Sequence, residues 1–463
     1  MHRSAKLAGV LALSLGVVGC TDFLTGPGLT ENPNNPTTAS ASQLFVGIQA
    51  NQFVQQEGQL ARTSAYYTQQ LSGTNNQQAD YGSAYTMGES EFNGWFANVY
   101  GGGGLLDMRR VQAMAREAGD QKLEGIVKVW EAFTIGMAAA GWGDIPYREA
   151  LDPNNPTPNL DPQQQVYADV QKVLDEAIAL LGGPSTMPAN VDLVYGGNAG
   201  RWRRAAYTLK ARFHMHTAER LGRPAYEAAL AAAQQGINEA PTSVADAVHG
   251  RAPGNFRTLH DNELTKANIW AQFLGARQDL TANRVLIDML KGRAGDPRLA
   301  GYFDPAGDGQ YRGADQFGRT NSQPMSTVDK ETRLQFTFRQ PLVTWAETQL
   351  IMAEAKFRLG DPVGALQNVN NVRTALGMPA LAGPITFEQV AEEKYIAMFQ
   401  NIEVWNDWKR TCYPKLTPGG PNFTSASMIP ARWVYGLTER QNNPNIPLPS
   451  KAPARNWNDP NPC

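Results

Sequence analysis

The chain has 463 residues, of which 42% are hydrophobic, and a formal net charge of −2 at pH 7. This composition is ample for a folded core. The balanced charge and the lack of a basic run argue against nucleic acid as a partner. No segment reaches the roughly 18 consecutive apolar residues of a membrane-spanning helix.

The N-terminal segment is typical of a secretory signal. Arg3 and Lys6 precede an apolar core over residues 7–18, which is too short to span a bilayer. The sequence VVGC that ends at Cys20 resembles a bacterial lipobox, in which the cysteine is diacylated and becomes the mature N-terminus. We therefore expect residues 1–19 to be removed and Cys20 to carry a lipid anchor, which would hold the protein on a membrane. The alternative is a plain signal peptide with a chance cysteine.

A flexible tether is expected next, because residues 20–40 are rich in Pro, Asn and Thr and show almost no apolar periodicity. Residues 41–463 are then predicted to form a single domain. Once Cys20 is acylated, only Cys412 and Cys463 remain. In an oxidising compartment two such thiols pair more often than not, so we expect a disulfide that ties the C-terminal tail to the body. Two free thiols are the alternative.

Helical periodicity and capping residues predict a mainly α fold. In the clearest pair of helices, Gly360 suits the position after a helix, Asp361 an N-cap and Pro362 a first helical residue, as in a tetratricopeptide-type hairpin. Gly222 and Pro224 make a similar break. The expected helices cover residues 43–71, 91–117, 121–140, 163–182, 201–221, 223–239, 281–291, 344–359, 362–376 and 386–400.

Long, mostly irregular loops are expected between these helices. A compact domain rarely keeps such loops unless they bind something, so the pattern predicts a helical frame that carries a loop-built surface. The loops cover residues 71–90, 141–162, 183–200, 240–280, 300–340 and 411–463.

The sequence offers little for catalysis. The histidines of HMH at 214–216 stand two apart, a spacing that does not bring side chains together on a helix. The GGGG run at 101–104 lacks the Lys-Ser/Thr of a phosphate loop and is better explained as a turn or a helix interruption. Asp144, Asp279 and Glu347 could supply an acid pair for glycoside cleavage, but the sequence does not pair them. We expect no catalytic centre, no metal site and no cofactor.

Aromatic residues in the loops are more suggestive, because a flat ring beside amide and charged groups suits the apolar faces and polar rims of sugars. Peptides or other small nutrients could use the same groups, and packing of the loops onto the frame is the structural alternative. The candidate ligand-binding residues are Asn76, Asp80, Tyr81, Tyr85, Trp270, Arg277, Tyr302 and Tyr311.

Several stretches together resemble the SusD/RagB family of nutrient-binding outer-membrane lipoproteins, and they run in order across nearly the whole mature chain. They are the TDFL that follows Cys20, GWGDIPYREA at 141–150, RWRRAAYTLKAR at 201–212, AEAKFRLGDPVGALQNVNNVRTALG at 353–377, EEKYIAMFQNIEVWNDWKRTCYPKLTP at 392–418 and IPARWVYGLTERQNN at 429–443. Cys412 and Cys463 depart from the general pattern of that family.

The resemblance implies a mainly helical body with four tetratricopeptide-like helix pairs and ligand contacts from the loops. It also implies a lipid-anchored, surface-exposed protein of the outer membrane that captures an oligosaccharide, peptide or similar nutrient and delivers it to a TonB-dependent transporter. Trp405, Trp408, Arg410 and Pro414 are then structural, with Arg410 satisfying buried carbonyls or acids. The alternatives are a helical scaffold that binds only protein and, less favoured, a surface glycosidase.

Overall fold

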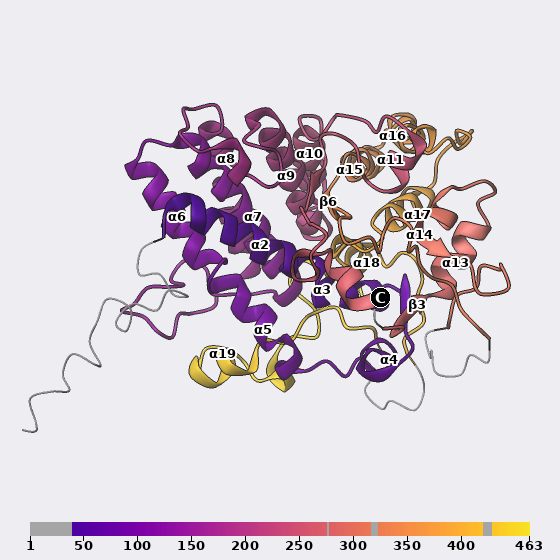
Figure 1. Cartoon of the computed structure of the whole chain (residues 1–463), viewed down its shortest axis with the longest axis horizontal. Coiled ribbons are helices and arrows are strands. Elements are labelled where there is room, and N and C mark those ends of the chain that lie inside the picture. Colours follow the sequence, from indigo (N-terminus) through magenta and orange to yellow (C-terminus); the bar gives the residue numbers. More distant parts are fainter. Residues whose placement is uncertain (1–38, 276, 316–322, 420–427) are drawn as a thin grey trace, which may run out of the picture.

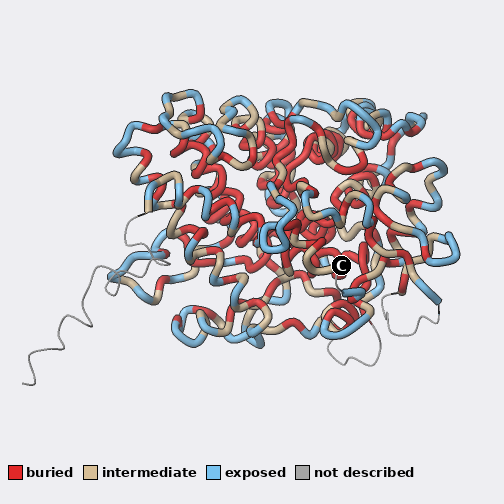
Figure 2. Tube along the Cα trace, in the orientation of Figure 1, coloured by how far each residue is buried: buried red, intermediate tan, exposed pale blue. Residues whose placement is uncertain are grey.

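The computed structural model describes residues 39–275, 277–315, 323–419 and 428–463 (Figure 1). The signal segment, Cys20 and most of the tether lie outside the described residues. Within them the protein is mainly helical, as the sequence predicts. Figure 2 shows buried residues running through the helices in the middle of the molecule, with exposed residues at the periphery.

A row of packed helices forms the frame. Each helix contacts the next in the order α6, α7, α8, α9, α10, α15, α16 and α17, and the upper edge of Figure 1 shows α8 to α16 side by side. Helices α2, α5 and α18 pack against this row, and α3 packs against α2 and α18. The bounds are α2 Ala41–Glu57, α3 Gln59–Tyr67, α5 Glu89–Tyr100, α6 Leu105–Glu117, α7 Gln121–Trp142, α8 Gln163–Leu180, α9 Ala199–Leu221, α10 Arg223–Ala233, α15 Trp345–Leu359, α16 Pro362–Ala375, α17 Phe387–Ala397 and α18 Glu403–Thr411.

The predicted hairpin between α15 and α16 is confirmed. Gly360 ends α15 with a φ of 91°, a left-handed conformation that glycine adopts without a Cβ penalty. The Asp361 side chain then accepts a hydrogen bond from the backbone N–H of Gly364, and Pro362 opens α16. The small buried side chains of Ala353 and Ala365 lie in the core between these helices.

Two predicted helices are each interrupted at glycine. The expected helix 43–71 breaks at Gly58, where a Cβ atom would lie 2.7 Å from the ring of Trp95. The expected helix 91–117 breaks in the GGGG run, where a Cβ on Gly103 would lie 2.5 Å from the Cβ of Asn51. Both breaks let helices approach closely, a requirement that helical periodicity along one segment does not reveal.

The expected loops are less irregular than predicted. They contain short helices and three antiparallel two-stranded ladders, β1–β3, β2–β6 and β4–β5. Strands of two or three residues are too short to give an alternating pattern. The bounds are α4 Asn76–Ser83, α11 Val244–Val248, α12 Ile269–Leu274, α14 Arg298–Tyr302, α19 Leu437–Asn442, β1 Leu71–Gly73, β2 Phe256–Arg257, β3 Leu280–Ala282, β4 Phe303–Asp304, β5 Thr327–Val328 and β6 Pro341–Val343. Helix α13, Arg284–Lys291, lies within the helix that the sequence predicts over residues 281–291.

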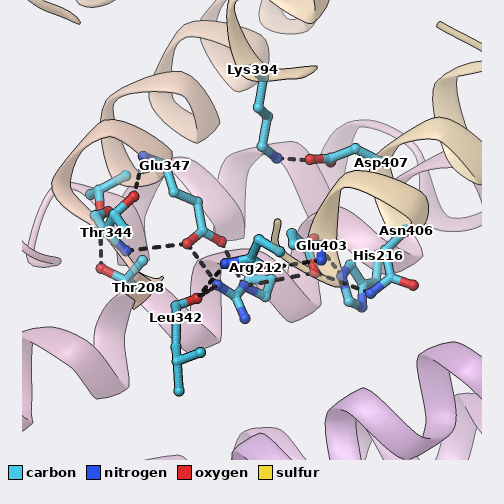
Figure 3. A network of polar contacts seen from close by, with 12 residues as sticks. Thr208, Arg212, His216, Leu342, Thr344, Glu347, Lys394, Glu403, Asn406 and Asp407 are labelled. Carbon is cyan, nitrogen blue, oxygen red and sulfur yellow. Dashed lines mark hydrogen bonds and ion pairs between the residues drawn. The ribbon is translucent and has the colours of Figure 1, made fainter. Parts of the chain in front are cut away.

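A buried ionic network joins the helices at the centre of the frame (Figure 3). Arg212 on α9 donates to both oxygens of Glu347 on α15, at 2.5 and 2.7 Å. Its guanidinium also lies 3.8 Å from Glu403 on α18, and His216 lies 2.7 Å from the same carboxylate. Burial would raise the pKa of Glu403, but His216 and Arg212 outweigh burial and hold that pKa well below its usual range. These charges are paired, which is what makes their burial tolerable.

The C-terminal segment is fixed to the body as the sequence predicts. Trp405 and Trp408 are buried, and the guanidinium of Arg410 pairs with the carboxylates of Glu354 and Asp407. Cys412 and Cys463 form a disulfide, with their Cα atoms 5.1 Å apart. The helix end at α18 and the last residues of the chain are therefore joined covalently.

Candidate functional site

Several of the irregular segments lie along the edge opposite the row of helices α8 to α16 (Figure 1). Figure 1 shows α4, α5 and α19 at this lower edge. The β1–β3 ladder fixes the segment before α4 to the segment after α12, with Leu71 opposite Ala282 and Gly73 opposite Leu280. Segments some two hundred residues apart in the sequence thus form one surface.

Three of the candidate residues lie on α4. Asn76 is exposed and has a φ of 51°, and its side-chain amide donates to Asp279 Oδ1 at 2.8 Å. Asp80 and Tyr81 are half-buried on the same helix. The bond from the Thr74 N–H to the carbonyl of Asp279, at 2.8 Å, strengthens the link to the segment that carries Arg277. The structure therefore brings Asn76, Asp80 and Tyr81 to one loop surface with Arg277.

Two guanidinium groups flank an aromatic ring at this surface. The Cζ atom of Arg62, on α3, lies 4.0 Å from the ring centroid of Phe273, and that of Arg277 lies 5.5 Å from it. Phe273 is half-buried and Arg277 is exposed. This arrangement places a half-buried aromatic ring beside positive charges and hydrogen-bond donors, groups that suit a ligand with an apolar ring and polar substituents.

Arg62 is the least satisfied member of the cluster. Its side chain is only 7% exposed, and its Nη2 atom donates to Gln59 Oε1 at 3.2 Å. Its Nε and Nη1 atoms have no hydrogen-bond partner among the described residues. Burial lowers the pKa of Arg62 to about 10, and the neighbouring charge of Arg277 acts in the same direction. Sequence reasoning missed this residue because it falls inside a segment whose pattern predicts an uninterrupted helix.

Tyr85 and Tyr311 are half-buried, so part of each side chain packs against the protein and part is exposed at the surface. The ring of Tyr85 meets that of Tyr67 edge-on, with centroids 5.4 Å apart. Its hydroxyl accepts a hydrogen bond from the N–H of Gly419 at 3.0 Å. Tyr311 packs against the main hydrophobic core. For these two residues, the packing alternative accounts for much of the side chain.

The prediction that Trp270 and Tyr302 bind the ligand is wrong. Trp270 is 0% exposed and Tyr302 is 2% exposed, so neither can contact a ligand in this structure. The ring of Tyr302 stacks on that of Phe399, with centroids 4.6 Å apart, and its hydroxyl donates to the carbonyl of Ile396 at 3.2 Å. Both aromatics lie on short helices within the expected loops, α12 and α14, and they anchor these helices to the core.

The acidic residues considered for catalysis do not come together. Glu347 is buried in the ionic network with Arg212, and Asp279 is buried beside Asn76. Asp144 is exposed and caps the start of α8 by accepting from the N–H of Gln163 at 2.7 Å. In the part of the chain that the structure describes, no group of three or more His, Cys, Asp or Glu side chains is placed to hold a metal ion.

Comparison with known proteins shows which protein family and which solved structures this chain is similar to. A family model described as "SusD-like_2: Starch-binding associating with outer membrane" matches residues 33–359. No curated protein sequence matches the chain. No helix within the described ranges is both long and apolar enough to cross a membrane.

Many solved structures share the fold. One titled a chitin-binding protein has a TM-score of 0.75 at 21% identity, covering 91% of this chain and 100% of its own. A SusD/RagB family protein from Bacteroides thetaiotaomicron has a TM-score of 0.71 at 20% identity, covering 92% and 98%. A chitin-binding SusD homolog from Flavobacterium johnsoniae has a TM-score of 0.70 at 18% identity, covering 90% and 97%.

Proposed function

The chain belongs to the SusD-like family, and we propose on this basis that it is an outer-membrane lipoprotein that captures an oligosaccharide and delivers it to a TonB-dependent transporter. The observation that carries the proposal is the family match over residues 33–359, whose description names starch binding and association with the outer membrane. The two neighbours whose titles name chitin binding favour a glycan over a peptide as the nutrient.

The glycan would bind at the surface formed by α4, α12 and the segment that follows it. Asn76, Asp80 and Tyr81 would supply hydrogen bonds and a ring edge. Phe273 with Arg277 would supply an apolar face with a donor beside it. The β1–β3 ladder holds these groups in place before a ligand arrives, so little ordering would accompany binding.

The remaining parts of the proposal concern the membrane anchor and the transporter partner. Cys20 would carry the lipid, and residues 20–40 would tether a single domain, residues 41–463, to the outer surface of the membrane. The protein would bind without catalysing a reaction. The transporter would take over the captured glycan, which requires binding weak enough to reverse.

The proposal is tested by calorimetric titration of the purified full chain with starch-derived, chitin-derived and peptide ligands. We expect a glycan to bind, and the Tyr81→Ala and Arg277→Ala variants to bind it about tenfold more weakly with unchanged melting temperatures. Arg223→Ala is the matched control, because Arg223 is an exposed arginine on α10, in a surface pair with Glu227. Binding of peptides alone, or equal affinity in all variants, would contradict the assigned ligand or site.

The anchor and the partner need separate measurements. Mass spectrometry of the mature N-terminus should find a diacylated Cys20. A pull-down from solubilised outer membrane should recover a barrel transporter. Recovery of the protein as an unacylated, partner-free species would contradict these parts and leave the ligand-binding part standing.

A further inference from the structure

A separate pocket of about 400 Å³ lies between α5, the segment 146–158 and α19. It contains none of the candidate residues. Its volume falls within the roughly 300–1,000 Å³ of sites that bind small organic ligands. Figure 1 shows α5 and α19 at the same lower edge as α4 but displaced along it.

The walls of this pocket are fixed by hydrogen bonds. Arg109 on α6 donates to the carbonyls of Ala150 and Tyr147, at 2.7 and 2.8 Å, and so holds the turn that forms one wall. The N–H of Thr438 donates to Asn93 Oδ1 at 2.8 Å, which joins α19 to α5. Further bonds across the walls are Asn443 to the carbonyl of Pro158 and Arg440 to the carboxylate of Glu89. The pocket is therefore preformed.

Two lining residues have features that a bound ligand would explain: a strained, exposed apolar residue and a buried hydroxyl without a hydrogen-bond partner among the described residues. Leu151 has a φ of 69°, an unfavourable conformation for a residue with a side chain, and it is 38% exposed although it is large and apolar. Tyr100 has a hydroxyl that is buried without a hydrogen-bond partner among the described residues. Burial, with Glu439 nearby, raises the pKa of Tyr100 well above its ordinary value, so the hydroxyl stays protonated and able to donate.

The lining indicates the class of ligand. Phe96, Leu106, Leu151 and three prolines form an apolar surface, and the polar groups are chiefly amides and carboxylates, with no lysine or arginine among the lining residues. The carboxylates of Asp152 and Glu439 would repel an anion and accept hydrogen bonds from hydroxyl groups. A neutral pyranose combines apolar C–H faces with a rim of such hydroxyls.

We propose that this pocket is a second binding site, which takes a neutral glycosyl unit against Leu106 and Leu151 with hydrogen bonds to Tyr100, Asn155 and Glu439. The site stands on its own lining and does not depend on the surface at α4 and α12. It would hold part of a glycan whose other part is bound elsewhere, or a short sugar by itself.

The test is a titration of the full chain, monitored by saturation-transfer NMR, with three sugars: glucose, N-acetylglucosamine and glucuronate. Ala97→Trp fills the pocket from an exposed lining position on α5. Ala113→Trp, exposed on α6 and outside the lining, is the matched control. We expect at least one neutral sugar to bind wild type and the control equally, and Ala97→Trp about tenfold or more weakly.

Tyr100→Phe provides a second variant that does not depend on tolerance of a bulky residue. Because the hydroxyl has no hydrogen-bond partner within the described ranges, its removal should leave the melting temperature unchanged or raised, while weakening neutral-sugar binding about tenfold. A purely structural tyrosine would not show this combination.

The proposal is overturned if no neutral sugar binds, if Ala97→Trp and Tyr100→Phe bind as wild type does, or if glucuronate binds more tightly than the neutral sugars. Arg277→Ala separates the two sites. Loss of binding in Arg277→Ala alone would overturn the second site and support the surface at α4 and α12. Loss of sugar binding in the pocket variants alone would support the second site and contradict the surface at α4 and α12.

Discussion

The guanidinium of Arg62 lies against the ring of Phe273, at 4.0 Å from its centroid, without an ion-pair partner among the described residues. Arg212 is similarly buried, but it forms a two-pronged pair with Glu347. The two arginines thus differ in whether their charge is compensated. An unpaired buried charge destabilises a fold, and the loss of one partner from a buried pair leaves such a charge behind.

Replacement of each arginine by methionine should show this difference. Arg62→Met removes a charge that has no carboxylate partner in the described part of the chain and keeps most of the side-chain volume. We expect a free energy of unfolding within about 1 kcal/mol of wild type. Arg212→Met leaves Glu347 buried without its partner and should cost about 3–5 kcal/mol. Urea unfolding followed by circular dichroism measures both, and equal losses would contradict the contrast.

The disulfide should stabilise the protein by constraining the unfolded chain. Cys412 and Cys463 are separated by 51 residues, and a closed loop of this length contributes about 2–4 kcal/mol. The Cys412→Ser/Cys463→Ser double variant should lose this amount in urea unfolding. Reductant should lower the stability of wild type to that of the double variant and leave the double variant unchanged. Two titratable thiols in the native mature protein would show that the bond does not form.

Acid should destabilise the protein in part through His249. Burial, together with the positive charges of Arg333 and Arg251, lowers the pKa of His249 to about 3. Between pH 6.5 and 3 the unfolded chain therefore binds a proton that the folded chain does not, so stability falls as the pH falls. In His249→Gln the loss across this interval should be smaller, by roughly 2 kcal/mol. Urea unfolding at a series of pH values measures it.

His260 provides a control of opposite sign. Burial lowers its pKa, but the carboxylate of Glu57, 2.8 Å away, outweighs burial, and the net shift is upward. The stability that this pair contributes is complete below the ordinary histidine pKa and is lost as the pH rises through the folded pKa. His260→Gln should therefore lower stability more at pH 5.5 than at pH 8.5. The same pH trend in both variants would contradict these assignments.

Two glycines on packed helices should respond oppositely to alanine. A Cβ atom on Gly136 of α7 would lie 2.2 Å from the ring of Phe213, so Gly136→Ala should cost about 1–3 kcal/mol. Gly94 of α5 has open space around the same position, so Gly94→Ala should stabilise by about 0.5–1 kcal/mol because alanine favours the helix. Thermal unfolding of the two variants, with wild type as reference, measures the difference. Stabilisation by both substitutions would show that the helices separate easily.

The residues that bound the helical hairpins could be read from the sequence because their effects are local. Gly360, Asp361 and Pro362 determine a helix end, an N-cap and a helix start within a few residues of themselves. The interruption at Gly58 was missed, because it depends on Trp95 of another helix, whereas the GGGG run that contains Gly103 was recognised as a turn or a helix interruption. The short strands were missed because a ladder of two or three residues is defined by its partner.

The candidate site was also predicted only in part from the sequence. The sequence located Asn76, Asp80, Tyr81 and Arg277 in segments that the structure joins through β1 and β3. It could not distinguish them from Trp270 and Tyr302, which are aromatic residues in similar segments but lie in the core. Burial depends on the neighbours that tertiary packing supplies, and residue type in an expected loop does not reveal them.

The sequence by itself determined the helical character of the protein, its hairpin breaks and the cysteine pair, since periodicity, capping and composition act along the chain. Only the tertiary structure decided which aromatics reach the surface, that Arg62 is buried without an ion-pair partner among the described residues, and that α5, α19 and the segment 146–158 enclose a pocket. These features arise where segments far apart in sequence meet. Their energetics depend on exclusion of water and on contacts between segments, which no single segment encodes.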